Sequence, residues 1–96
     1  MSMFISQVTL SKEGLQGLKG VPERIEENRK LWEDAGGRLV SWYVVLGDYD
    51  YLLVTEAANE KVMAEIVAKA SGRGRTQFKT NVAIPINEFA EVAGNL

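Results

Sequence analysis

The sequence predicts an α+β fold of ferredoxin-like type, with the element order β-α-β-β-α-β and a four-stranded antiparallel sheet. Two observations support this prediction. Residues 22–35 and 59–71 repeat apolar side chains at helical spacing. Four other segments have the length, the β-branched and aromatic content and the flanking turn residues of strands. The order of these six segments is that of a split βαβ unit.

The first strand and the first helix lie in the N-terminal part of the chain. We expect the strand over residues 3–10, where Phe4 and Val8 point to one side. We expect the helix over residues 22–35, because Pro22 suits a first helical turn and a pair of glycines follows the apolar stripe. Three spaced glycines between the two elements predict a flexible loop that could act as a lid: Gly14, Gly17 and Gly20.

Three strands, a second helix and a short tail are expected in the rest of the chain. A tight turn at residues 47–50 should form a hairpin, because Gly and Asp supply the backbone conformations that hairpins need. Asn59 is a good N-cap, since its side chain can accept a hydrogen bond from a free N–H of the first turn. The expected elements are strands over 39–46, 51–56 and 75–83, a helix over 59–71, and a terminal turn or helix carrying Phe89 and Val92.

Length and composition limit the class of protein. A chain of 96 residues with 46% hydrophobic side chains predicts a single globular domain over residues 1–96. The net charge of -2 disfavours nucleic acid as a partner, because such binding depends on a concentrated basic surface. We expect no membrane helix, which needs ~20 apolar residues, and no signal peptide, because the N-terminus lacks a basic region. A cytoplasmic location is therefore expected.

The sequence contains neither cysteine nor histidine. Disulfides, thiolate metal sites and a cysteine nucleophile are therefore excluded. The commonest general base and the commonest metal ligand are missing as well. We expect no metal site and no cofactor, and haem handling is disfavoured because a tyrosine would have to bind the iron.

The expected sheet is apolar on both faces, although two helices can cover only one of them. The strand over residues 39–46 places Trp42 on one side and Tyr43 on the other, both among apolar neighbours. Soluble monomers rarely expose an apolar patch of this size. We therefore expect a homo-oligomer in which a second copy covers the open face, most fully around Trp42, Tyr43 and Tyr51. The alternative is that the C-terminal tail folds back over that face.

Several short motifs make the chain similar to the GYD domain family, which is named after a Gly-Tyr-Asp-type hairpin. Here the hairpin reads Gly47-Asp48-Tyr49-Asp50 and leads into an apolar strand. Four further segments match in order: Pro22-Glu23-Arg24, Gly36-Gly37-Arg38-Leu39, Glu56-Ala57 and Gly74-Arg75-Thr76. Gln77 stands where the family has an acidic residue, so no carboxylate role carries over to that position. The resemblance spans Met3 to Val92.

The resemblance implies a dimeric α+β barrel, in which the sheets of two subunits pack face to face. It implies no particular activity. Proteins of this fold include cofactor-free monooxygenases, lactone isomerases, haem-degrading enzymes and amino-acid-sensing regulatory domains, and fold alone does not assign function.

Seven residues are candidates for binding a small-molecule ligand: Trp42, Tyr43, Asp48, Tyr49, Asp50, Arg75 and Lys79. The two aspartates of the hairpin could share a proton or act as acid and base. Aspartate is also a common turn residue, and we favour that interpretation. Two side chains supply too few oxygen ligands for calcium.

The aromatic and cationic candidates each have two interpretations. The aromatic residues near the hairpin could line a pocket, but strands and interfaces favour the same residue types, and we prefer that interpretation. Arg75 and Lys79 lie on one face of the last strand, with Arg73 just before it, and could bind a carboxylate or phosphate. Contact with solvent, or an ion pair with the acidic first helix, is the simpler interpretation.

Two functions are consistent with these residues. We favour a non-catalytic homo-oligomer that binds a small ligand or has a structural or regulatory role, because histidine and cysteine are absent. The alternative is a small cofactor-independent enzyme, similar to a monooxygenase or an isomerase, acting on an aromatic or enolic substrate in a closed pocket. A solvent-connected cavity lined by Tyr and by Arg or Asp would favour the enzyme, and a filled core would favour a structural role.

Overall fold

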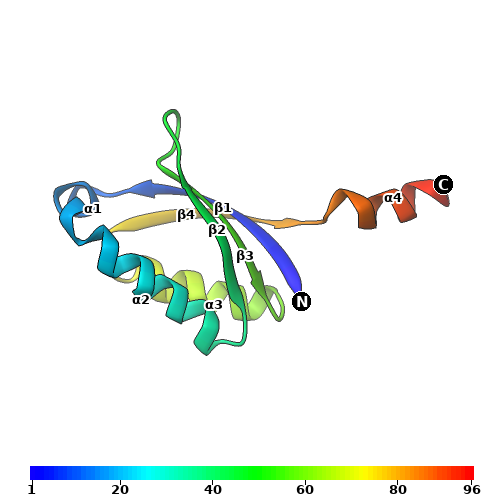
Figure 1. The fold of residues 1–96 in the computed structure, drawn as a ribbon, viewed down its shortest axis with the longest axis horizontal. Coiled ribbons are helices and arrows are strands. Elements are labelled where there is room, and N and C mark those ends of the chain that lie inside the picture. Colours follow the sequence, from blue (N-terminus) through cyan, green and yellow to red (C-terminus); the bar gives the residue numbers. More distant parts are fainter.

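The computed structural model describes residues 1–96, and Figure 1 shows a curved antiparallel sheet with two long helices on one side. The strands are β1 (Ser2–Leu10), β2 (Arg38–Val44), β3 (Tyr51–Ala57) and β4 (Thr76–Ala83). Their order in the sheet is β2-β3-β1-β4, so the first and third strands are central and the second is an edge strand. The predicted α+β fold with a four-stranded antiparallel sheet is confirmed.

The two helices that cover the sheet are α2 (Val21–Asp34) and α3 (Glu60–Ser71). Each begins where the sequence predicts. Pro22 lies in the first turn of α2, and the Asn59 side chain accepts a hydrogen bond from the Val62 N–H at 2.9 Å. Gly36 follows α2 with a φ of 80°, a conformation that glycine adopts without strain. No helix of the chain combines the length and the apolar character needed to cross a bilayer.

The core lies between the sheet and these helices. Side chains from β1 and β3 alternate between the two faces, and those on the helix side are buried. Trp32 of α2 and Met63 of α3 are among the most buried side chains, at 0% and 2% exposure. The buried apolar cluster consists of Phe4, Val8, Trp32, Tyr51, Leu53, Ala57, Met63 and Ile66.

A bulge in β2 decides which of its side chains face the helices. The register of the β2–β3 pair shifts after Leu39, and Trp42 then pairs with Leu53, a buried residue on the helix side. Trp42 therefore faces the helices, and Tyr43 faces the open side. The prediction that Trp42 and Tyr51 add to the apolar surface of the open face is wrong. Trp42 and Tyr43 are neighbours on one strand and point to opposite faces, and Tyr51 pairs with the buried Val8 on the helix side.

The segment before α2 also differs from the expectation of a flexible loop. It forms a short helix, α1 (Lys12–Gln16), and a 3-10 turn, η1 (Leu18–Gly20). Gly14 is buried, and a Cβ atom there would overlap the carbonyl oxygen of Arg75. The glycine therefore permits a close backbone approach between α1 and the start of β4.

The C-terminal segment is a helix, α4 (Ile86–Gly94), but it does not fold back over the sheet. Figure 1 shows α4 extending beyond the end of β4, away from both long helices. The reason is local: Pro85 has extended backbone angles (φ -55°, ψ 139°), so the helix starts past the edge of the sheet. The alternative in which the tail covers the open face is therefore wrong.

Candidate functional site

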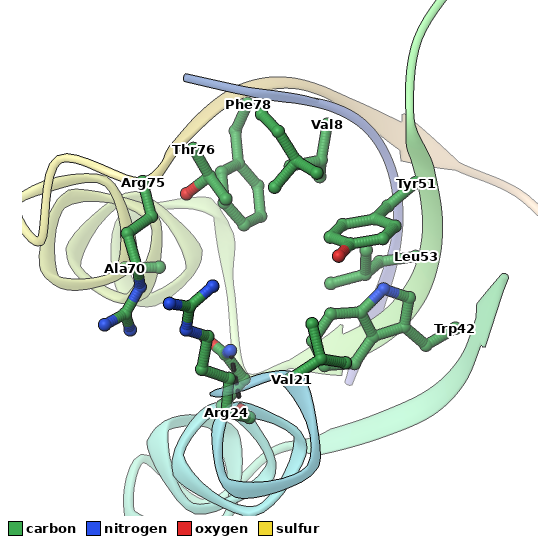
Figure 2. Close-up of a pocket in the computed structure, with 12 residues that line it drawn as sticks. Val8, Val21, Arg24, Trp42, Tyr51, Leu53, Ala70, Arg75, Thr76 and Phe78 are labelled. Carbon is green, nitrogen blue, oxygen red and sulfur yellow. Dashed lines mark hydrogen bonds between the residues drawn. The ribbon is translucent and has the colours of Figure 1, made fainter. Parts of the chain in front are cut away.

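A small cavity lies between the sheet and the long helices, with walls from all four strands (Figure 2). Its volume is about 30 Å³, which is room for about two water molecules. Most of the wall is apolar. The polar side chains that reach it are Arg24, Asn28, Tyr51, Arg75 and Thr76.

The cavity adjoins a wider groove between β2 and the segment formed by α1, η1 and the start of α2. The groove has a volume of about 770 Å³ and mostly apolar walls. Cavity and groove share four wall residues: Leu10, Val21, Trp42 and Tyr51. Together they form one largely apolar site, with several polar side chains at the cavity end.

Two aromatic residues stand where cavity and groove meet. The rings of Trp42 and Tyr51 pack edge to face, with centroids 5.3 Å apart. Burial raises the pKa of the Tyr51 hydroxyl above its usual value, the nearby Arg24 guanidinium opposes this rise, and the Asp50 carboxylate adds to it. Tyr51 is therefore neutral at pH 7, and its hydroxyl, which Figure 2 shows directed into the cavity, can donate a hydrogen bond.

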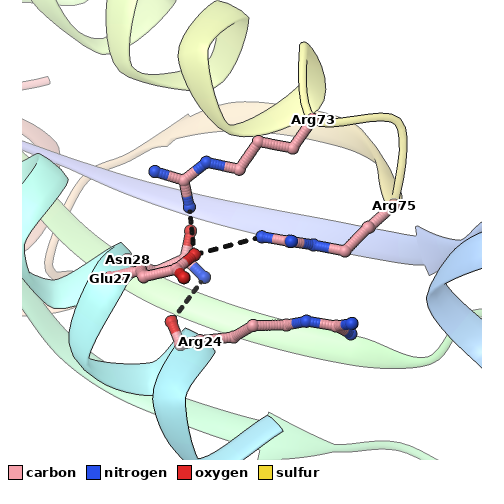
Figure 3. A network of polar contacts seen from close by, with 5 residues as sticks. All are labelled: Arg24, Glu27, Asn28, Arg73 and Arg75. Carbon is pink, nitrogen blue, oxygen red and sulfur yellow. Dashed lines mark hydrogen bonds and ion pairs between the residues drawn. The ribbon is translucent and has the colours of Figure 1, made fainter. Parts of the chain in front are cut away.

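An arginine cluster lies at the opposite side of the cavity (Figure 3). Glu27 of α2 accepts hydrogen bonds from Arg73 at 3.0 Å and from Arg75 at 3.2 Å. This is the ion pairing with the acidic helix that the simpler interpretation of these cations predicts. Arg24 lies beside the cluster and takes no part in these bonds.

The structure brings only some of the sequence candidates together. Trp42 and Arg75 line the cavity, and Asp50 lines the groove. The other four lie elsewhere: Tyr43 and Lys79 on the open face of the sheet, Asp48 and Tyr49 in the hairpin. No group of three or more acidic side chains lies together as a cation site would require.

Two residues of the site, Arg24 and Tyr51, are not among the sequence candidates. The sequence places Tyr51 in the aromatic cluster near the hairpin, which could line a pocket or form an interface, and the structure places it at the cavity. Arg24 has a signal in the sequence: it follows Val21 by three residues and therefore lies on the apolar stripe of the helix. In the structure this position brings the Arg24 side chain to the wall of the cavity.

The hairpin aspartates have different roles in the structure. The Asp50 carboxylate accepts a hydrogen bond from the Leu10 N–H at 2.7 Å, which fixes the hairpin to the end of β1. Asp48 is exposed. Asp50 therefore holds the hairpin against β1, which is a structural role beyond the turn itself.

Asp50→Ala is expected to lower the free energy of unfolding by about 1–3 kcal/mol, because it leaves the Leu10 N–H without its charged acceptor. Asp48→Ala is the matched control and should change stability by less than about 0.5 kcal/mol. Urea denaturation followed by circular dichroism measures both values. Equal losses for the two variants would contradict the assigned role of Asp50.

The comparison with known families agrees with this fold. The sequence profile of the GYD domain matches residues 4–93. The chain belongs to the GYD domain family. In this GYD domain, the hairpin that resembles the family motif carries Asp50 and leads directly into Tyr51 of the cavity.

Two similar proteins come from Thermus thermophilus. One is the "Glutamine synthetase and cystathionine beta-lyase binding protein", which is 39% identical over 90 residues, covering 93% of this chain and 95% of the relative. The other is TTHA0845, whose crystal structure matches with a TM-score of 0.54 at 14% identity, covering 88% of this chain and 95% of that chain. At this identity the second similarity concerns the fold alone.

Proposed function

We propose that this GYD protein is a non-catalytic, homodimeric binding protein that docks on an enzyme of the kind its relative is named for. The similarity to that relative is the observation that carries the proposal, because 39% identity extends over 93% of the chain. Exposed apolar surfaces on two sides of the molecule support it.

The open face of the sheet supports the homodimer. β1, β2 and β3 present apolar side chains there, among them Ile5 at 38% and Tyr43 at 56% exposure. β4 contributes polar residues to the same face: Gln77, Lys79 and Asn81. Face-to-face packing of two such sheets, as in a dimeric α+β barrel, would bury the apolar part and leave β4 at the rim, which is the usual arrangement of an interface.

The terminal helix α4 supports a second interface, with the enzyme. Ile86, Phe89 and Val92 are 76%, 48% and 57% exposed, and no other element packs on them. Glu88 and Glu91 give the helix a charged side. Short amphipathic helices of this kind bind in apolar grooves of partner proteins.

The cavity bears on the alternative of a cofactor-independent enzyme. A cavity lined by Tyr and Arg is the feature that would favour catalysis over a purely structural role. The polar side chains that reach the cavity are cationic or neutral, and the neutral Tyr51 is a hydrogen-bond donor, so none of them can act as a general base. Binding is therefore the better supported function.

The proposal is tested by measuring binding of the purified protein to purified glutamine synthetase and to cystathionine beta-lyase, with light scattering for its own mass. We expect a dimer that binds at least one enzyme. Phe89→Ser should weaken enzyme binding by about tenfold or more, as loss of an aromatic anchor does. Tyr43→Ser should instead weaken the dimer.

Leu96→Ser is the matched control for the helix variant, because Leu96 is 98% exposed and lies beyond α4. It should leave both measurements unchanged. A monomer at micromolar concentration would contradict the dimer. Absence of binding to both enzymes would contradict the partner assignment.

A further inference from the structure

Arg24 is the one arginine of the chain without an ion pair. The other four each bind a glutamate: Arg29 with Glu26, Arg38 with Glu56, and Arg73 and Arg75 with Glu27. The Arg24 guanidinium makes no hydrogen bond to the protein either, since only its backbone carbonyl accepts one, from Asn28 at 2.8 Å. The guanidinium nitrogens are not among the buried unsatisfied atoms of the chain, so they are open to water and free to bind a ligand that enters the cavity.

The fold makes room for this guanidinium at the cavity. The Arg24 side chain reaches from α2 toward the sheet (Figure 2). A Cβ atom at Gly17 would overlap its Nη2 atom, and one at Gly20 would lie 3.4 Å from that atom. The glycines between α1 and α2 therefore give the guanidinium the space that a side chain would fill.

The local charge is positive. Arg73 and Arg75 share the Glu27 carboxylate, while the Arg24 guanidinium extends away from it in Figure 3, and Asp50 in the groove is the other carboxylate at the site. The side chains of Arg73 and Arg75 are only 30% and 25% exposed, so solvent compensates their charge incompletely. An anion beside Arg24 would reduce this excess of positive charge.

We propose that the cavity binds the carboxylate group of an organic acid whose apolar body lies in the adjoining groove. The carboxylate would bind the Arg24 fork and accept a hydrogen bond from the Tyr51 hydroxyl. Space for about two water molecules matches the two oxygens of a carboxylate and not the larger phosphate group. The apolar walls of the groove suit an aromatic or aliphatic body.

This site is separate from the proposed protein interfaces. It lies on the helix side of the sheet, whereas the homodimer uses the open face and the enzyme would bind α4. A variant can therefore lose binding of the small ligand and still bind its protein partners, or lose protein binding and still bind the small ligand.

The test compares three probes of similar shape: 3-phenylpropionate, its neutral amide 3-phenylpropanamide, and phenyl phosphate. Calorimetry measures the affinity, and tryptophan fluorescence reports occupancy, because Trp42 lines the site while Trp32 is fully buried in the core. We expect saturable binding of the carboxylate, with the amide and the phosphate weaker by about tenfold or more.

Arg24→Gln should weaken binding of 3-phenylpropionate by about tenfold or more. Lys30→Gln is the matched control: it makes the same charge change at an exposed position of the same helix and should leave binding unchanged. Circular dichroism verifies that both variants are folded. The comparison of acid with amide on the unaltered protein needs no variant at all.

Three results would overturn the proposal. The first is that the carboxylate probe fails to bind. The second is that the amide or the phosphate binds as tightly as the acid. The third is that Lys30→Gln weakens binding as much as Arg24→Gln does.

Discussion

Trp32→Ala is expected to lower the free energy of unfolding by about 3–5 kcal/mol. Trp32 is fully buried and lies in the apolar cluster between α2 and the sheet. Truncation would remove the largest of the fully buried side chains and leave a cavity that the neighbouring side chains fill only in part. Domains have a total stability of roughly 5–15 kcal/mol, so this variant should be close to unfolding.

The matched variant is Trp32→Phe. The indole N–H of Trp32 has no hydrogen-bond partner in the core, and a buried unsatisfied donor costs about 1–3 kcal/mol. Phenylalanine removes that donor and retains most of the apolar volume, so its loss of stability should be clearly smaller than that of alanine. Urea denaturation measures both. A loss below about 1 kcal/mol for Trp32→Ala would show that this part of the core is loosely packed.

Gly14→Ala should also lower the free energy of unfolding, by about 1–3 kcal/mol, because the added methyl group forces the packing apart. The added Cβ would overlap the carbonyl oxygen of Arg75 and lie 3.1 Å from the Leu10 side chain. The carbonyl that the new methyl group would meet belongs to the backbone, so it cannot rotate away as a side chain would. The Ser11 N–H also donates to the Arg75 carbonyl at 2.9 Å, so that moving α1 away from β4 would break this bond as well.

Gly47→Ala is the control for this prediction. Nothing lies within 4 Å of a Cβ atom at Gly47, and its φ is not positive. Its substitution should therefore change stability by less than about 0.5 kcal/mol. Chemical denaturation of the two variants in parallel is the measurement. Similar losses at both positions would contradict the close approach at Gly14.

Most of the fold could be predicted because its elements have local causes. Apolar spacing predicted α2 and α3, and Pro22 and Asn59 marked their first turns correctly. The hairpin between β2 and β3 was predicted from its Gly and Asp residues, but β2 ends at Val44, so the connection covers residues 45–50 and is longer than the predicted tight turn. The path of the tail could not be predicted. A short amphipathic helix has an apolar face, but its sequence does not show whether the same chain or a partner covers that face.

The candidate site was predicted less well. Trp42 and Arg75 were identified as ligand candidates and do line the cavity. Tyr43 and Lys79 were grouped with them because of residue type and nearness in sequence, yet both face the other side of the sheet. Nearness along a strand does not place two side chains together, because successive residues of a strand point to opposite faces of the sheet.

The sequence by itself determined the order of the elements, their caps and the excess of apolar surface on the sheet, because each depends on residues close together in the chain. Only the tertiary structure decided which charges meet. Glu27 bonds to two arginines that lie 46 and 48 residues further along the chain. Arg24, three residues before it, is left without a partner. The packing of α2 against α3 decides this difference, because it brings the segment after α3, which carries Arg73 and Arg75, to the Glu27 carboxylate.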